Sequence, residues 1–266
     1  MALTNQLLAT KLFMPPTRSF LVSRVRLVEL LEQGAQCKLT LICAPPGFGK
    51  TMLVAEWHQA YPEIPLAWLS LDETDNEPVR FLRYLVAAFR AFVPNECENI
   101  LSNLNSPQPA GAEVVLTSLI NVLTDFIAEQ DLKRLSLVLD DYHLIQNELI
   151  HKAVTFFLDH LPPQLHLIIT SRSDPLLPLH RLRARNQLLE IRAAELRFQL
   201  DETMALVMQD SQLKESLARE DIARLTIRTE GWAVGLQLAL VWLRGRENRT
   251  DALKTFSGNT ALCWNI

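Results

Sequence analysis

One stretch decides the fold of this chain: Leu39-Thr40-Leu41-Ile42-Cys43-Ala44-Pro45-Pro46-Gly47-Phe48-Gly49-Lys50-Thr51, an apolar run that ends in a Gly/Pro turn followed by Lys-Thr. A triphosphate is bound by backbone N–H groups on a tight loop, a helix N-terminus, an ammonium group and a hydroxyl that ligates Mg²⁺. Lys50 would supply the ammonium and Thr51 the hydroxyl, so the stretch predicts a phosphate-binding loop. We expect nucleotide contacts from Pro46, Gly47, Phe48, Gly49, Lys50 and Thr51.

The motif differs from the full Walker A pattern at one position. That pattern is G-x-x-x-x-G-K-[ST], and Ala44 stands where its first glycine belongs. The context favours the motif, because residues 38–43 form a short apolar run rich in β-formers and residues 51–57 continue as a helix former. The alternative is an ordinary strand–turn–helix connection with a chance Gly-Lys-Thr.

The composition of the chain is typical of a soluble globular protein. The chain has 266 residues, of which 48% are hydrophobic and 21% charged, enough for one large α/β domain and a smaller partner. A net charge of −4 gives no overall attraction to nucleic acid or anionic membranes. A local basic segment, read as a solvated face, contains Arg181, Arg183, Arg185, Arg192 and Arg197.

Cysteine spacing and hydropathy favour a reducing compartment. The cysteines at positions 37, 43, 97 and 263 have no C-x-x-C spacing, so neither a zinc site nor a disulfide framework is indicated. No apolar run reaches the roughly 18 residues of a membrane span, and no export signal is visible. We therefore expect a cytoplasmic protein with no membrane partner.

A second apolar strand, Leu135 to Leu139, ends in the carboxylates Asp140 and Asp141. This is the Walker B arrangement, in which the first carboxylate holds Mg²⁺ opposite the loop hydroxyl. We expect Thr51 and Asp140 as metal ligands, and Asp141 as the catalytic residue that polarises the attacking water. The alternative is a strand that happens to end in a carboxylate turn. His143 has no ligand partner at metal spacing and is read as a surface or capping residue.

A third apolar strand, residues 165–170, leads into Ser171 and Arg172. Ligands bind at the carboxyl edge of such sheets, so Arg172 is a candidate catalytic residue that contacts the γ-phosphate. The alternative is a surface arginine that neutralises Asp174.

The remaining pattern predicts a parallel sheet covered by helices on both faces, because continuous apolar strands alternate with helices. Further strands are expected at 65–71 and 188–191, helices at 25–32, 113–128 and 148–161 and from residue 78, and a surface loop at 94–109. The strand at 65–71 favours the ASCE-type order, in which another strand separates the loop strand from the Asp140 strand. We expect a P-loop nucleotide-binding domain at 1–195, a small helical lid or sensor domain at 196–250 and an incomplete or irregular tail at 251–266.

These landmarks together resemble the N-terminal nucleotide-binding module of the large ATP-dependent LuxR-type (MalT-like) transcription regulators, which belong to the STAND class of P-loop ATPases. The resemblance covers most of the chain, and Ala at position 44 is usual in that family. It rests on the segments Thr10-Lys11-Leu12, Leu21-Val22-Ser23-Arg24, Ala44 to Thr51, Trp68-Leu69-Ser70-Leu71-Asp72, Val138-Leu139-Asp140-Asp141-Tyr142-His143, Thr170-Ser171-Arg172-Ser173-Asp174-Pro175, and Glu230 to Ala239.

The resemblance implies an ADP-bound resting form that exchanges to ATP when an inducer binds, self-associates and activates transcription through a C-terminal helix-turn-helix. It also implies that Arg24 lies near the base or ribose. The last dozen residues depart from the family pattern, and we expect no sensor or DNA-binding domain, and so no direct DNA contact, in this segment. If the chain is the complete natural product, we expect a truncated remnant that holds nucleotide without transmitting a signal.

Three functions remain open at this point. The first is a nucleotide-dependent switch that binds ATP/ADP and Mg²⁺ and hydrolyses ATP slowly. The second is a P-loop small-molecule kinase, which would need an acceptor pocket and a lid that the sequence does not reveal. The third is a catalytically inactive interaction module that keeps only the fold.

Overall fold

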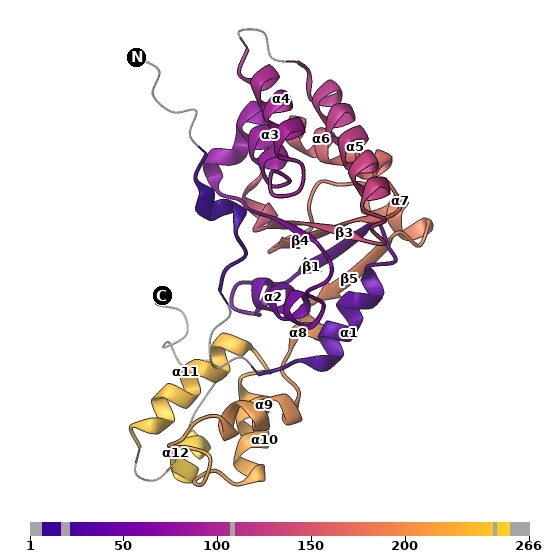
Figure 1. Ribbon diagram of the computed structural model, residues 1–266. Helices are drawn as coiled ribbons and strands as arrows, with labels where there is room; N and C mark the ends of the chain where they lie inside the picture. The colour runs from indigo at the N-terminus through magenta and orange to yellow at the C-terminus, as the bar shows by residue number, and fades with distance from the viewer. Residues whose placement is uncertain (1–6, 17–21, 107–109, 247–248, 256–266) are drawn as a thin grey trace.

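The computed structural model describes residues 7–16, 22–106, 110–246 and 249–255. Its centre is a five-stranded sheet of order β2-β3-β4-β1-β5 in which every neighbouring pair is parallel (Figure 1). The strands are β1 (Leu39–Cys43), β2 (Leu66–Ser70), β3 (Leu135–Asp140), β4 (Leu165–Ser171) and β5 (Leu188–Arg192). Because β4 separates β1 from β3, the predicted ASCE-type order is confirmed.

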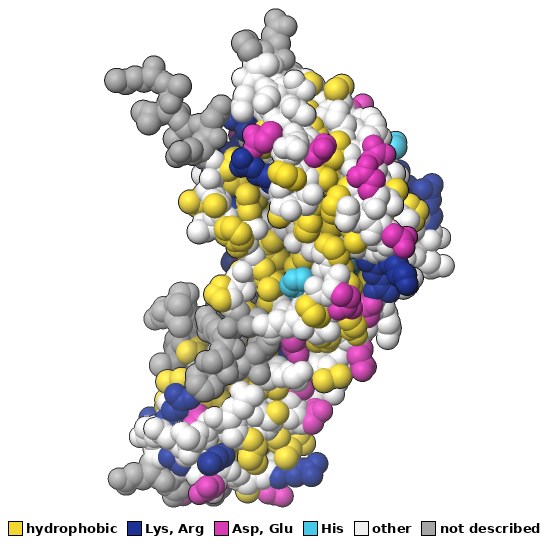
Figure 2. Space-filling view, in the orientation of Figure 1, with side chains coloured by type: hydrophobic (Ala, Val, Ile, Leu, Met, Phe, Trp, Pro, Cys, Tyr) yellow, Lys and Arg dark blue, Asp and Glu magenta, His cyan; other side chains and the backbone are white. Residues whose placement is uncertain are grey.

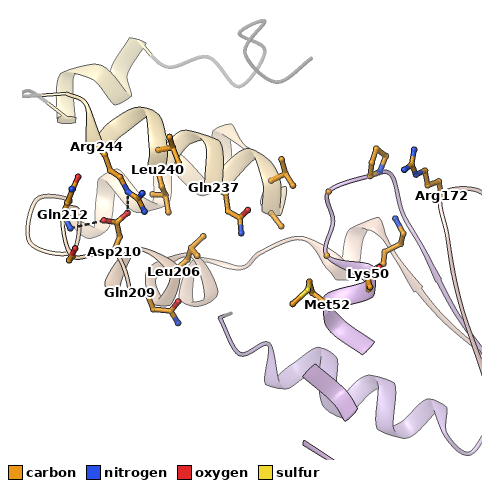
Figure 3. Close-up of a pocket in the computed structure, with 18 of the residues that line it drawn as sticks. Lys50, Met52, Arg172, Leu206, Gln209, Asp210, Gln212, Gln237, Leu240 and Arg244 are labelled. Carbon is orange, nitrogen blue, oxygen red and sulfur yellow. Dashed lines mark hydrogen bonds and ion pairs between the residues drawn. The ribbon is translucent and has the colours of Figure 1, made fainter. Parts of the chain in front are cut away.

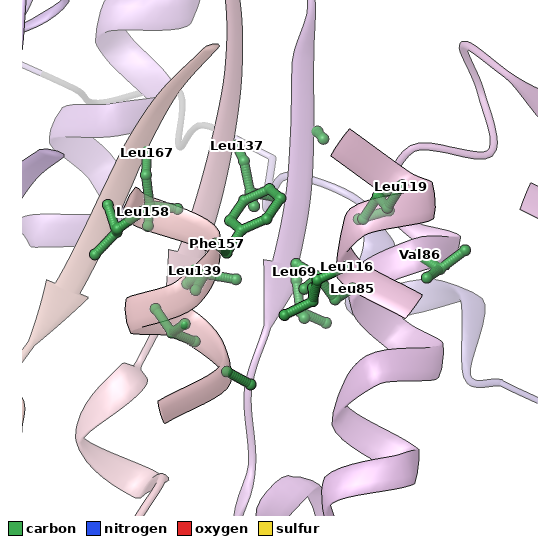
Figure 4. Packing of buried hydrophobic residues seen from close by; sticks show 14 of the residues in the cluster. Leu69, Leu85, Val86, Leu116, Leu119, Leu137, Leu139, Phe157, Leu158 and Leu167 are labelled. Carbon is green, nitrogen blue, oxygen red and sulfur yellow. The ribbon is translucent and has the colours of Figure 1, made fainter. Parts of the chain in front are cut away.

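Helices cover both faces of the sheet, as the sequence predicts. Along β3, Leu137 and Leu139 pack into a cluster with α3, α4, α5 and α6, whereas Val138 between them packs into a second cluster with α1 and α2. Figure 4 shows the first cluster, where Phe157 and Leu158 meet the strands. These helices are α1 (Val25–Gly34), α2 (Lys50–Ala60), α3 (Pro78–Ala87), α4 (Pro94–Leu104), α5 (Ala112–Glu129) and α6 (Glu148–His160).

The C-terminal helices pack around a third apolar cluster, beyond α2 (Figure 1). They are α9 (Leu200–Met208), α10 (Arg219–Arg228), α11 (Ala233–Arg244) and α12 (Arg249–Thr255), and they follow the short helices α7 (Leu179–Ala184) and α8 (Ala193–Leu196). Three 3₁₀ turns complete the described part: η1 (Ala9–Leu12), η2 (Glu73–Asn76) and η3 (Tyr142–Leu144). Residues 251–255 of the expected irregular tail are helical, and 256–266 lie outside the described residues. Within the described ranges, no helix has both the length and the apolar character needed to cross a membrane.

The expectation of a surface loop at 94–109 is wrong, because Pro94–Leu104 forms α4. Proline occupies the first turn, where its missing N–H costs nothing. Four apolar residues then follow at the i, i+3, i+4, i+7 spacing of a buried helix face, and all are buried: Cys97, Ile100, Leu101 and Leu104. The Asn and Ser residues between them occupy the other face and hid this periodicity.

Four of the five arginines of the local basic segment, all but Arg185, are engaged in ion pairs within the described residues. On the face shown in Figure 2, basic and acidic side chains lie interspersed. The pairs are Arg181 with Asp159, Arg183 with Glu190, Arg192 with Asp174 and Glu190, and Arg197 with Glu230.

A buried histidine makes the stability of the fold depend on pH. His166 in β4 is fully buried, and its Nε2 lies 2.9 Å from the Thr40 hydroxyl. Burial lowers the pKa of His166 to about 3, below the usual value of about 6.5. The unfolded chain therefore binds a proton that the folded chain does not between these two pH values. The contribution of the neutral, buried His166 to the free energy of unfolding is complete above pH 6.5 and is lost as the pH falls toward 3.

We expect the free energy of unfolding to fall on acidification by up to about 1.4 kcal/mol per pH unit from this group alone. Urea unfolding at pH 7, 6, 5 and 4 measures it. A His166→Gln variant, which can still hydrogen-bond the Thr40 hydroxyl, should show a shallower slope by about one proton. An unchanged slope would exclude His166 as the source.

Candidate functional site

A cavity of about 700 Å³ lies between the carboxyl edge of the sheet and helices α9 and α11. Figure 3 shows Lys50, Met52 and Arg172 on one side of it, and Leu206, Gln237 and Arg244 on the other. Predicted site residues that line it are Pro46, Gly47, Gly49, Lys50, Thr51, Asp141 and Arg172. The cavity therefore joins most of the predicted site to helices of the C-terminal part.

The loop between β1 and α2 has the backbone of an anion-binding turn. Gly47 and Gly49 adopt φ values of +79° and +81°, which L side chains rarely adopt, and α2 begins directly after Gly49. Within the described residues, no carbonyl or side chain accepts a hydrogen bond from the amides of Gly47, Phe48 and Gly49. Unpaired amides beside a helix N-terminus fit the oxygens of a polyphosphate.

Lys50 is buried at the first position of α2. Its Nζ donates hydrogen bonds to the carbonyls of Ala44 (2.8 Å) and Pro45 (3.2 Å). Burial lowers the pKa of Lys50, and the neighbouring Asp141 carboxylate acts in the opposite direction. The ammonium is thus held inside the loop by neutral carbonyl acceptors, and an anionic ligand would offer it acceptors that carry the opposite charge.

The Thr51 hydroxyl and the Asp140 carboxylate meet across the sheet edge. Thr51 Oγ1 donates to Asp140 Oδ1 at 3.0 Å and also lies 3.2 Å from Oδ2. Asp140 is 4% exposed, and this burial raises its pKa. A hydroxyl and a carboxylate are the oxygen donors that Mg²⁺ takes in phosphoryl-transfer sites, so these residues fit the metal expected from the sequence.

Thr170, at the end of β4, joins the two carboxylate residues. Its hydroxyl donates to Asp140 Oδ1 at 2.6 Å and accepts the backbone N–H of Asp141 at 3.0 Å. Asp141 adopts a left-handed backbone conformation, with φ 58°, that this hydrogen bond helps to hold. Thr170 was not among the predicted site residues; the only signal for it in the sequence was its place at the carboxyl end of an apolar strand.

Replacing Thr170 by valine should destabilise the fold by about 1–3 kcal/mol, because it removes a donor from a buried carboxylate and an acceptor from a backbone amide. Thr170→Ser keeps the hydroxyl and is the matched control. Urea unfolding at pH 7 measures both variants. Equal stability of the valine variant and the unmodified chain would exclude the bridging role of the hydroxyl.

Asp141, which lines the cavity, lies beside His143. The Asp141 side chain is 44% exposed, and its Oδ1 lies 3.7 Å from His143 Nδ1. His143 was expected at the surface or as a cap, but its side chain is only 11% exposed and neither ring nitrogen makes a hydrogen bond. Burial lowers the pKa of His143, which favours the neutral ring.

Arg172 projects from the end of β4 as an exposed side chain that lines the cavity. Asp174, the partner in the alternative interpretation, pairs with Arg192 instead. Among the described residues, no acidic side chain forms an ion pair with Arg172, so its charge is available at the cavity.

Three predicted site residues do not line the cavity: Arg24, Phe48 and the buried Asp140. The Arg24 guanidinium donates to the carbonyl of Leu196 at 2.7 Å and lies 3.5 Å from Glu202. Glu202 lies in α9 and Leu196 at the end of α8, so these contacts tie Arg24 to the C-terminal helices, and its role beside a base or ribose stays a prediction. Phe48 packs against the second apolar cluster and does not line the cavity either, so only its backbone remains a candidate contact.

The comparisons with known proteins agree with this geometry. No protein-family model matches the chain. It is 40% identical over 245 residues to the serine/threonine-protein kinase PknK of Mycobacterium tuberculosis strain H37Rv, covering 91% of this chain and 21% of that protein. It is 39% identical over 249 residues to the HTH-type transcriptional regulator MalT of Yersinia enterocolitica, covering 94% of this chain and 26% of that protein. The chain therefore spans about a fifth to a quarter of the length of these relatives.

Solved structures share the fold. A STAND protein with a tetratricopeptide repeat sensor from Pyrococcus horikoshii matches with a TM-score of 0.59 and 18% identity, covering 85% of this chain and 30% of that chain. A Walker-type ATPase from Pyrococcus abyssi matches with a TM-score of 0.58 and 15% identity, covering 89% and 72%. At these identities the similarity demonstrates the fold alone.

Proposed function

Since the chain is a MalT-like P-loop module of the STAND class, we propose that it is the nucleotide-binding switch of a transcription regulator, which binds ATP or ADP with Mg²⁺ and hydrolyses ATP slowly. The observation that carries the proposal is the 3.0 Å contact between the Thr51 hydroxyl and Asp140, with the buried Lys50 ammonium in the same loop. Thr51 and Asp140 are 89 positions apart in the sequence, and the sheet brings them to one edge.

Each residue has a distinct role in this proposal. The Gly47, Phe48 and Gly49 amides and Lys50 bind the β- and γ-phosphates, and Thr51 and Asp140 hold Mg²⁺. The metal, when bound, neutralises charge on the phosphate oxygens. Asp141 orients the attacking water, and Arg172 contacts the γ-phosphate.

The domain division and the partners are part of the same proposal. Residues 1–195 would form the nucleotide-binding domain and 196–250 the helical lid or sensor, because the cavity lies where the sheet edge meets α9 and α11. Self-association in the ATP form and the absence of direct DNA contact by this segment are proposed on the family resemblance, and a cytoplasmic location on the cysteine spacing and hydropathy of the sequence.

The kinase in the name of one relative does not make kinase activity the preferred proposal. Nearly the same length of this chain, 245 and 249 residues, matches a protein named as a kinase and one named as a transcription regulator, and it covers only 21% and 26% of them. The shared segment is therefore more simply explained as a regulatory nucleotide-binding part common to both. A small-molecule kinase and a segment that cannot signal remain the alternatives to test.

Measurements on the unmodified chain separate these functions. Calorimetric titration with ATP and ADP, with Mg²⁺ or with a chelator, measures binding, and steady-state phosphate release measures hydrolysis. Tight, Mg²⁺-dependent binding with slow hydrolysis supports the switch. A kinase would instead form ADP rapidly without releasing phosphate, and only when a hydroxyl compound is added, which a parallel assay of ADP formation detects; absence of binding contradicts both functions.

A further inference from the structure

The N-terminal end of α11 docks directly on the phosphate-binding loop. The Trp232 indole Nε1 donates a hydrogen bond to the carbonyl of Pro46 at 3.1 Å, and the Val234 backbone N–H donates to the carbonyl of Gly47 at 3.2 Å. Two successive loop carbonyls are therefore each held by a donor from a segment 186 residues away in the sequence.

This docking fixes the direction of two loop amides. The peptide bonds of the described loop are trans, so each carbonyl and the N–H of the same peptide plane point in opposite directions. Holding the Pro46 carbonyl turns the Gly47 N–H away from Trp232, and holding the Gly47 carbonyl turns the Phe48 N–H away from Val234. Both amides lack an acceptor within the described residues, and they belong to the groups assigned above to phosphate.

Without this contact the loop would have considerable freedom at this point. Gly47 adopts φ +79°, and glycine populates positive and negative φ with similar ease. A peptide plane next to glycine can therefore turn over at little cost. A free loop would lose entropy when a polyphosphate orders it, whereas a held loop has already lost it.

The fit between the two segments depends on glycines at both sides. A β-carbon at Gly47 would lie 2.8 Å from the Trp232 Nε1, and one at Gly235 would lie 2.6 Å from the Trp232 ring. At Gly231, with φ +67°, a β-carbon would lie 2.5 Å from the carbonyl oxygen of Phe198. Gly47 thus leaves room for the Trp232 ring on the loop, Gly235 leaves room for that ring beside α11, and Gly231 allows the close approach to Phe198 before it.

We propose that Trp232 and the Val234 amide are positioning groups that pre-orient the phosphate-binding loop for a polyphosphate. The inference rests on the proposed function, because it requires the loop to bind phosphate. Its consequence is that α11 and the phosphates are energetically coupled: any movement that lifts α11 from the loop weakens phosphate binding, and phosphate binding favours the docked helix.

The test replaces the donor and keeps an aromatic ring. Trp232→Phe removes the indole N–H, and Trp242→Phe is the matched control on the same helix, where the Trp242 ring packs under Arg246 at 4.7 Å. Calorimetry with ATP and with inorganic tripolyphosphate measures affinity, and thermal unfolding checks the fold. One neutral hydrogen bond contributes about 0.5–1.5 kcal/mol, so we expect Trp232→Phe to lower the affinity for both ligands by the same factor of roughly 2 to 13, and Trp242→Phe to leave both affinities unchanged.

A spectroscopic readout separates positioning from general destabilisation. The indole N–H resonance that disappears in Trp232→Phe should shift in the unmodified chain when tripolyphosphate is added, because the two sites are coupled. Three results would each overturn the inference and leave the proposed function standing. They are unchanged affinities in a folded Trp232→Phe variant, a lower affinity for ATP but not for tripolyphosphate, and an indole resonance that does not shift when the ligand is added. Absence of binding of both ligands to the unmodified chain would overturn the two together.

Discussion

Replacing Lys50 by alanine should abolish detectable binding of ATP. The ammonium is the one cationic side chain placed inside the loop by the local sequence, where it is held by the carbonyls of Ala44 and Pro45. Charge-assisted hydrogen bonds contribute about 1.5–3 kcal/mol each, so losing the contacts to the β- and γ-phosphates should lower affinity by at least about 100-fold. Calorimetric titration with Mg²⁺ and ATP measures the change.

Lys38 offers a matched control for this variant. Its Nζ also donates to two backbone carbonyls, those of Leu158 and Asp159, but it lies just before β1, at the opposite end of that strand from the loop. Lys38→Ala should therefore retain ATP affinity. If Lys50→Ala bound ATP as tightly as the unmodified chain, the phosphate-loop assignment would be wrong.

Replacing Asp141 by asparagine should preserve ATP binding and remove hydrolysis. The Asp141 side chain is 44% exposed and lines the cavity, whereas the candidate metal ligand Asp140 is buried and hydrogen-bonded by Thr51 and Thr170. Asparagine keeps the shape of the side chain but cannot accept a proton from water. General-base catalysis contributes about 10²–10⁴-fold, so phosphate release should fall by that factor with little change in the dissociation constant for ATP.

Asp159→Asn provides the corresponding control, because Asp159 pairs with Arg181 and does not line the cavity. It should leave both binding and hydrolysis unchanged. Normal turnover in Asp141→Asn would assign the orientation of water to another residue, and a parallel loss of ATP binding would indicate that Asp141 acts on the ground state.

Much of the fold and part of the candidate site could be predicted from local sequence. Residues 39–51 predict strand, loop and helix in order, since the apolar run, the glycines and the Lys-Thr pair are contiguous. Continuous apolar strands predicted the parallel, helix-covered sheet, and its carboxyl edge predicted the meeting of Thr51 with Asp140. The helix Pro94–Leu104 was missed because its polar face dominated the composition of the segment.

The sequence by itself determined the phosphate-binding loop, the apolar strands of the sheet and the carboxylates at its edge, because each depends on the chemistry of neighbouring residues. Only the tertiary structure decided that Thr170 bridges Asp140 and Asp141, that Arg24 faces Leu196 and Glu202, and that α11 rests on the loop. These contacts join residues from about 30 to more than 180 positions apart, and their existence depends on how packed elements meet, which no local pattern encodes.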